Sequence, residues 1–273
     1  MVTQIGLPHP SLQEYVSQYL FMEHYFTENI LSPCIPRGLS ALMFPIHEVD
    51  SQTICRESTN NVVFKSGEVY LFGQATEVQW VTALGKVAVF YAVLQPLALH
   101  QLMREQAAVF TDKTVALSEW YPQSKIIVEQ LCSARSLQEQ LALLDAFFFE
   151  LFKQARPKTD ETNSSIYHIF QSKGLISVEE LARKERVSTR NLQRKFVEKV
   201  GMTPKTYVRT IRFRALMQYL LTHPDASLLD LACLFNYHDH SHLIKDFYHF
   251  TGNTPAHYLK QEQIVDGYFL KYL

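Results

Sequence analysis

The chain has 273 residues, of which 47% are hydrophobic and 19% charged, and its formal net charge is −1 at pH 7. This length suits two domains, and the composition excludes a disordered protein because it supplies enough apolar side chains for buried cores. No positively charged leader precedes an apolar stretch and no apolar run reaches about 18 residues, so we expect a soluble cytoplasmic protein that does not span a membrane.

The first half of the chain is expected to form a small antiparallel β sandwich or barrel. Residues 11–26 are rich in aromatics and fit either an amphipathic helix or a strand. From Leu39 onward, runs rich in β-branched and aromatic residues alternate with Gly, Asn, Ser and charged residues, which is typical of strands joined by tight turns. The sequence Leu84-Gly85-Lys86 indicates a hairpin turn between two of these strands.

After Gln95-Pro96 the pattern changes to helices, which we expect to pack on the sheet. The best defined helix covers residues 137–152, where apolar side chains recur at 4-3-4-3 spacing and so form one stripe. The stripe consists of Leu137, Leu141, Leu144, Phe148 and Leu151. It covers only about two heptads, so the sequence leaves open whether this helix packs in the core or forms the seam of a homodimer.

A polar segment divides the chain. Residues 156–165 contain Pro157 and lack apolar periodicity, which favours a linker. We therefore expect an N-terminal domain over residues 1–155, for effector sensing or dimerisation, and an all-α domain over residues 166–273.

The sequence predicts neither a metal site nor a cofactor. The four cysteines lie far apart without the spacing of metal ligands, so we expect free thiols. His238, His240 and His242 alternate, but residues two apart do not share a helix face.

The all-α half contains one pattern twice. Residues 177–207 and 227–258 match at an offset of 50 in the first helix and 51 afterwards. Each copy reads helix, short turn, helix and the start of a third helix. The pattern predicts two helix-turn-helix units, over 177–200 and 227–250, joined by one long helix. The matched pairs are Leu181-Ala182 with Leu231-Ala232, Leu192 with Leu243, Phe196 with Phe247, Gly201 with Gly252, Pro204 with Pro255, and Tyr207 with Tyr258.

Capping signals mark where these helices begin. Ser177 and Glu180 predict a capping box at the start of the first unit. Thr203-Pro204 and Thr254-Pro255 each supply an N-cap followed by a proline that suits the first helical position.

Positive charge is concentrated in the first unit. The segment Lys173–Arg214 has 12 Lys/Arg and 4 Asp/Glu, a net charge of +8, which indicates a binding surface for a polyanion. Arg190, Gln193 and Arg194 lie opposite the apolar face of the second helix, and these residue types pair with guanine and adenine edges. We expect them to contact bases. The expected phosphate contacts are Lys184, Arg186, Lys195, Lys199, Lys205 and Arg209.

The second unit lacks this charge. Residues 223–263 have a net charge of −3, and the expected recognition helix offers His240, Ser241, His242 and Lys245 to bases. We therefore expect weaker binding by this unit, or binding that depends on imidazole protonation near about pH 6.5.

The C-terminal hundred or so residues resemble the DNA-binding domain of the AraC family of bacterial transcription regulators. The resemblance rests on Leu192-Gln193-Arg194-Lys195-Phe196, Gly201-Met202-Thr203-Pro204 and the second-unit pattern LACLFNYHDHSHLIKDFYHFTGNTPAHYL. It implies that the two recognition helices enter successive major-groove segments of double-stranded DNA, and that RNA polymerase is a partner. The sequence departs from the family at Lys245, near which an Arg is common, and at the histidines, where neutral polar residues are usual.

The N-terminal half resembles the sensing domains of such regulators more loosely, through Pro36-Arg37-Gly38 and YAVLQPLALHQLM. The resemblance implies a small-molecule effector or dimerisation but names no ligand. Arg37 is a candidate to pair with an anionic effector; its alternative role is structural.

Other functions fit the sequence less well. A cupin-like enzyme fused to a helix-turn-helix domain would need a metal-binding set of His-x-His with Glu, which the sequence lacks. The sequence also lacks a Gly-rich phosphate loop and a nucleophile elbow, which mark other enzyme classes. An interaction module that does not bind DNA would not need the +8 segment. We therefore expect a regulator and not an enzyme.

Overall fold

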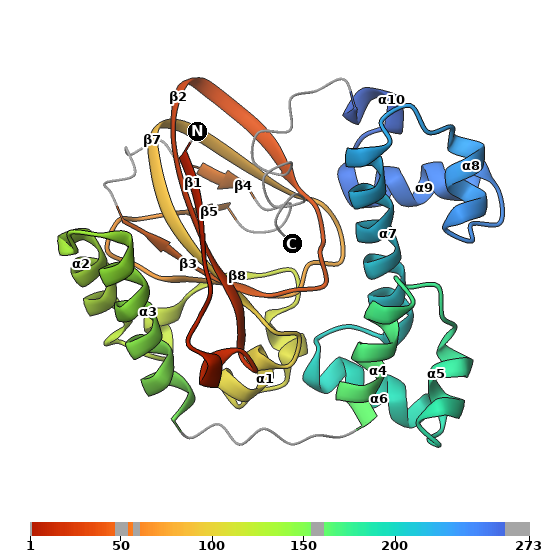
Figure 1. Cartoon of the computed structure of the whole chain (residues 1–273), viewed down its shortest axis with the longest axis horizontal. Coiled ribbons are helices and arrows are strands. Elements are labelled where there is room, and N and C mark those ends of the chain that lie inside the picture. The colour runs from red at the N-terminus through yellow and green to blue at the C-terminus, as the bar shows by residue number, and fades with distance from the viewer. Residues whose placement is uncertain (1, 47–53, 57–60, 154–160, 260–273) are drawn as a thin grey trace.

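The computed structural model describes residues 2–46, 54–56, 61–153 and 161–259. A β-rich domain lies beside an all-α domain (Figure 1), which confirms the expected α+β class. Within the described ranges, no helix has the length and apolar character needed to cross a membrane. Residues 156–160 of the expected linker and the chain end from 260 lie outside the description.

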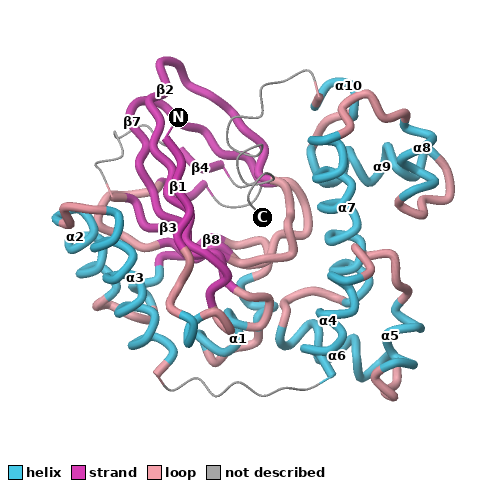
Figure 2. The backbone as a smooth tube through the Cα atoms, in the orientation of Figure 1, coloured by secondary structure: helices cyan, strands magenta, loops and turns pink. Residues whose placement is uncertain are grey.

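The N-terminal domain is built on one antiparallel sheet, drawn in magenta in Figure 2. The strand order is β1-β2-β7-β3-β6-β8, and β4 and β5 attach through β7. Two long strands dominate it, since β2 and β7 pair along most of their length. The strands are β1 (Val2–Gly6), β2 (Val16–Cys34), β3 (Ala41–Pro45), β4 (Ile54–Arg56), β5 (Asn61–Val63), β6 (Tyr70–Phe72), β7 (Gln79–Leu94) and β8 (Thr114–Ala116). Short 3-10 turns are η1 (Pro10–Leu12), η2 (Ala107–Phe110) and η3 (Leu117–Glu119).

Two sequence predictions for this sheet are resolved or corrected. The ambiguous residues 11–26 lie mostly in β2, so the strand reading holds. The hairpin turn predicted at Gly85 is wrong, because Gly85 lies inside β7 and pairs with Phe26. Gly85 has φ +74, which glycine adopts at no steric cost, and β2 is irregular just after Phe26. The glycine therefore marks an irregularity in a continuous strand.

The two faces of the sheet have different cores. Along β7, Ala88 and Phe90 pack on the side covered by helices, whereas Val87 and Val89 pack on the opposite side. This alternation follows from the two-residue period of a strand. The helices of this domain are α1 (Ala98–Met103), α2 (Ser124–Ser133) and α3 (Leu137–Phe152).

The apolar stripe of α3 packs on its own domain. Leu144 and Phe148 are fully buried in the core that contains Phe44 and Phe90. Leu137, Leu141 and Leu151 pack against the same core. The core role that the sequence left open is therefore the one observed, and a dimer through residues 137–152 stays a prediction.

Truncating this stripe should be costly. We expect Leu144→Ala to lower the free energy of unfolding by about 2–5 kcal/mol, because it leaves a cavity at a fully buried position. Phe149→Ala, at a side chain that is 41% exposed, should change it by roughly 1 kcal/mol or less. Chemical denaturation of both variants measures the difference. Equal losses would contradict this packing.

The all-α domain consists of two units on one long helix, α7 (Pro204–Thr222), as expected. The first unit contains α4 (Glu161–Gln171), α5 (Val178–Lys184) and α6 (Thr189–Lys199); the second contains α8 (Leu228–Leu234), α9 (His240–Thr251) and α10 (Pro255–Tyr258). Each unit has a separate core, and α7 contributes Tyr207 and Ile211 to one and Phe213 and Leu216 to the other.

The predicted helix starts are mostly confirmed. Ser177 and Glu180 form both hydrogen bonds of the capping box, and Thr203 caps α7. Thr254 precedes α10 without a side-chain cap bond. Residues 161–165, assigned to the linker from their polarity, instead belong to α4, where Thr162 and Ser165 are buried.

Candidate nucleic-acid interface

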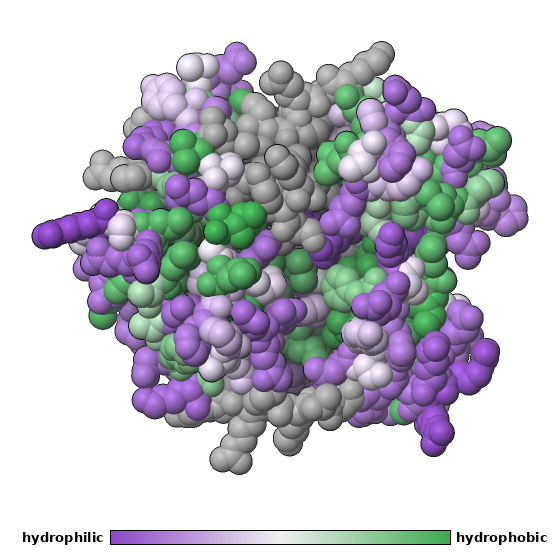
Figure 3. Space-filling model, viewed as in Figure 1, coloured by the Kyte–Doolittle hydropathy of each residue, from purple (hydrophilic) through white to green (hydrophobic). Residues whose placement is uncertain are grey.

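The helix α6 presents the residues expected to read bases. Ser188 caps its first turn by accepting a hydrogen bond from the Asn191 amide, and Leu192 and Phe196 fix the opposite face in the core. Arg190, Gln193 and Arg194 are all exposed, as the 3.6-residue period requires, and line a shallow hollow along the helix. Hydrophilic side chains also predominate around α5 and α6 in Figure 3.

Neighbouring side chains hold Arg194 in place. Its guanidinium donates to Asn191 Oδ1 at 3.1 Å and pairs with Glu198 Oε2 at 3.2 Å. These contacts restrict the rotamers of a flexible side chain while leaving it exposed. Arg190 is exposed as well, one turn earlier.

The expected phosphate contacts fall into two groups. Lys184, Arg186 and Lys205 are exposed. Lys195 instead pairs with Glu161, and Arg209 pairs with Asp246, so both positive charges are compensated within the domain. Lys199 is half-buried and also has a partner in the protein. The first group fits a role as phosphate ligands better than the second.

The helix α9 is the counterpart in the second unit. Asp239 caps it by accepting a hydrogen bond from the His242 amide at 2.7 Å, and this bond lowers the pKa of Asp239. His240, Ser241, His242 and Lys245 are exposed on its surface. The structure thus brings all four sequence candidates to the solvent face of one helix.

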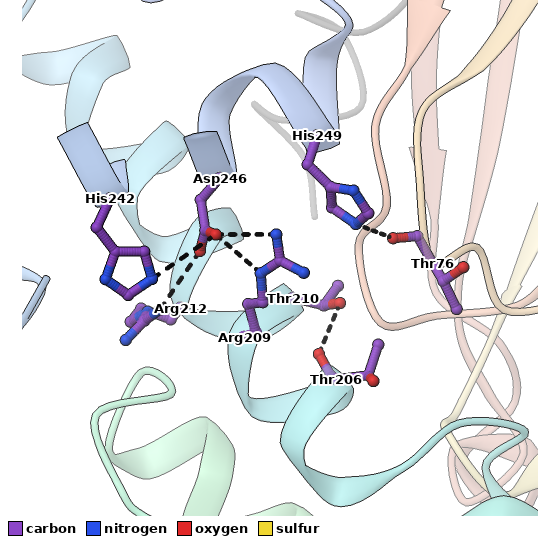
Figure 4. A network of polar contacts seen from close by, with 8 residues as sticks. All are labelled: Thr76, Thr206, Arg209, Thr210, Arg212, His242, Asp246 and His249. Atoms are coloured by element: carbon purple, nitrogen blue, oxygen red, sulfur yellow. Dashed lines mark hydrogen bonds and ion pairs between the residues drawn. The ribbon is translucent and has the colours of Figure 1, made fainter. Parts of the chain in front are cut away.

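A buried carboxylate anchors α9 to the long helix α7 (Figure 4). Asp246 is 3% exposed and accepts from Arg209 Nε at 2.9 Å and from Arg212 Nη2 at 3.4 Å. The exposed His242 lies 4.0 Å from the same carboxylate. Arg212 also stacks over the Tyr237 ring at 4.2 Å. The network fixes the orientation of the recognition helix relative to α7.

A second candidate site lies in the N-terminal domain, on the sheet face away from α3. It is a cavity of about 130 Å³, whose walls come from β2, β3, β6, β7 and residues 34–41. The lining is mostly apolar, with Met22, Phe64 and Val89 among it, and Arg37 and Ser40 add polar groups. Ser40 Oγ is buried and finds no hydrogen-bond partner among the described residues.

The wall of this cavity touches α7 directly. The buried Tyr207 hydroxyl donates to the Gly38 carbonyl at 3.1 Å, and Arg214 donates to the Arg37 carbonyl at 3.4 Å. Ile35 is 2% exposed and belongs to the core of the second helix-turn-helix unit. Burial lowers the pKa of Arg214, and the nearby charge of Arg37 acts in the same direction.

Comparison with known proteins agrees with this arrangement. The family described as "Helix-turn-helix domain" matches residues 181–261, and the family described as "Domain of unknown function (DUF6597)" matches residues 4–116. The C-terminal part of the chain therefore contains an AraC-type helix-turn-helix domain, the kind that binds DNA in transcription regulators. No curated protein is similar enough in sequence to count as a match.

Solved structures resemble the whole chain at low identity. ToxT from Vibrio cholerae is 10% identical, with a TM-score of 0.52 over 95% of this chain and 98% of that chain, and shows the same two-domain fold. ToxT bound to an unsaturated fatty acid is 12% identical, with a TM-score of 0.48 over 88% and 94%. The AraC-like transcriptional activator CuxR is 10% identical, with a TM-score of 0.23 over 80% and 86%.

The sequence analysis did not identify two functional residues of α9, the recognition helix of the second unit. Tyr248 is 61% exposed and continues the surface of Ser241 and Lys245 at helical spacing, a pattern visible in the sequence. Asp246 was counted only as a charge that opposes DNA. Because its pairing with Arg209 and Arg212 joins two separate helices, no local pattern announces it.

Proposed function

We propose that the regulator reads two successive major-groove segments on one face of DNA, with α6 in one and α9 in the other. The observation that carries the proposal is the pair of exposed polar helix faces joined by the 19-residue helix α7. A helix of that length extends about 28 Å, close to the roughly 34 Å between successive major-groove segments. The regulator is proposed to act in the cytoplasm with RNA polymerase as a partner.

In this proposal α6, the first reader, binds DNA more strongly than α9, the second reader. In the first segment Arg190, Gln193 and Arg194 contact bases, while Lys184, Arg186 and Lys205 bind phosphates. The second segment receives His240, Ser241, His242 and Lys245, in a unit with far less positive charge. The first segment therefore supplies most of the affinity.

Footprinting on DNA selected from random sequence tests this assignment. Two protected segments about one helical turn apart are expected, and the second should be protected more weakly, because its unit carries far less positive charge. A single protected segment would refute reading by the second unit. Replacing His240 and His242 with alanine should weaken protection of the second segment only, and unchanged protection would remove the role of the histidines.

We further propose that the cavity binds a small apolar effector with an acidic end. The apolar lining suits a hydrocarbon body, while Arg37 and the buried Ser40 hydroxyl suit a carboxylate. A cavity of about 150 Å³ accommodates one benzene ring, so the observed 130 Å³ fits one aromatic ring or a short alkyl chain. Because residues 35–38 contact both cavity and α7, an occupant would act on the helix that carries both readers.

Benzoate and its neutral analogue benzyl alcohol test the effector class. Benzoate should stabilise the regulator against heat and benzyl alcohol should do so less, because only the acid can pair with Arg37. Arg37→Gln should remove the difference, by a loss of roughly tenfold in benzoate affinity for one charged contact. Trp120→Ala, at a side chain that does not line the cavity, is the control and should bind as wild type. Equal binding of both probes would contradict the acidic class.

A further inference from the structure

Both recognition helices end against the same part of the N-terminal domain. Thr111 Oγ1 donates to the carbonyl of Gly201, at the end of α6, at 2.6 Å. At the end of α9, His249 Nε2 donates to the Thr76 carbonyl at 3.0 Å. Gly201 and Gly252 occupy equivalent positions in the two repeats. The second is covered by Trp80, so that a Cβ on Gly252 would lie 2.7 Å from the indole.

Asp112 joins these two contact points. One of its carboxylate oxygens accepts from the Thr76 amide and the other from the Thr76 hydroxyl, each at 2.6 Å. Asp112 directly follows Thr111 in the chain. A continuous path therefore runs from the end of α6 through Thr111, Asp112 and Thr76 to His249 on α9; Figure 4 shows its last contact.

We propose that Asp112 is a positioning residue for DNA reading, because it joins the two loops that contact the recognition helices. We call the connected residues Thr111, Asp112 and Thr76 the brace. The long helix α7 is otherwise the main connection between units whose cores are separate. Bending or twisting α7 would change the separation of α6 and α9. Support at the ends of both helices opposes that change, so the brace sets which spacing of DNA segments the regulator accepts.

The brace is also continuous with the cavity. Gly73 and Ala75, which line the cavity, belong to the same loop as Thr76, and Gln79, which also lines it, begins β7 directly after this loop. The Asp112 amide also donates a hydrogen bond to the Gln74 carbonyl at 2.9 Å, so Asp112 contacts this loop at both Gln74 and Thr76. The brace thus forms part of the wall between the cavity and the DNA-binding domain.

Operator spacing tests the brace, which rests on the proposed reading of two segments. Full-length wild type and Asp112→Gly are titrated with the selected duplex and with duplexes that carry one or two extra base pairs between the segments. Glycine removes both acceptors and adopts the φ of +57 at this position without strain. Wild type should lose about tenfold in affinity on insertion, and the variant about threefold or less, because half-site spacing is a geometric match.

Two milder variants keep the test decisive if Asp112→Gly does not fold. Thr111→Val removes the hydroxyl that holds Gly201 and should relax the spacing preference, whereas Thr111→Ser keeps the hydroxyl and should restore it. The same loss on insertion for wild type, Asp112→Gly and Thr111→Val would overturn the brace while leaving two-segment reading intact. Wild type that tolerates insertions also overturns the brace. A wild-type footprint on one segment only would instead refute the proposed function.

Discussion

Replacing Asp246 with alanine is expected to lower the free energy of unfolding by about 3 kcal/mol, the lower end of the cost of breaking a buried ion pair. The carboxylate is almost fully buried, and its removal leaves Arg209 and Arg212 without their acid at the junction of α7 and α9. The lower end applies because the Arg209 side chain is 33% exposed and keeps some hydration. Helical circular dichroism during denaturation measures the loss.

The same variant should lose protection of the second DNA segment before that of the first. Asp246 orients α9, whereas α6 belongs to a separate core. Asp225→Ala is the matched control, since it removes an exposed acid from the same unit and should change stability by roughly 0.5 kcal/mol or less. If Asp225→Ala and Asp246→Ala destabilise equally, the network does not anchor the recognition helix.

The parts of the fold that the sequence predicted are those specified by local chemistry. A hydroxyl and a carboxylate three residues apart, as at Ser177 and Glu180, satisfy helix amides wherever they occur before an apolar run. Leu192, Phe196 and Gly201 recur fifty-one residues later, and this repeat identified both helix-turn-helix units because each unit is specified within a short stretch of sequence. Gly85 was misread because positive φ suits either a hairpin or a strand irregularity, and the partner strand decides between them.

The parts that the sequence could not predict depend on contacts between distant segments. The exposure of Arg190 and Arg194 follows from the period of one helix. By contrast, Arg209 differs from an ordinary surface cation through its pairing with Asp246, 37 residues later. The contacts of Tyr207 with Gly38 and of Thr111 with Gly201 join the two domains, and nothing near either residue in sequence indicates a partner. Coupling between domains is therefore visible only in the folded chain.

Removing either arginine of the first reader should weaken specific DNA binding strongly. We expect Arg190→Ala and Arg194→Ala each to cost about 1–3 kcal/mol on the selected operator and to relax the base preference at one position. Arg194 is held by Asn191 and Glu198, so it loses less rotamer freedom on binding than an unsupported arginine. Asn191→Ala should accordingly reproduce part of the Arg194→Ala loss.

A variant at an expected phosphate contact distinguishes base contacts from nonspecific attraction to the DNA backbone. Lys205→Ala removes one exposed cation near the start of α7 and should weaken specific and random DNA by similar factors, because phosphates carry no sequence information. The arginine variants should lose more on the operator than on random DNA. Equal losses on both would show that Arg190 and Arg194 touch only phosphates, and specificity would then have to come from Gln193 or from the shape of the DNA.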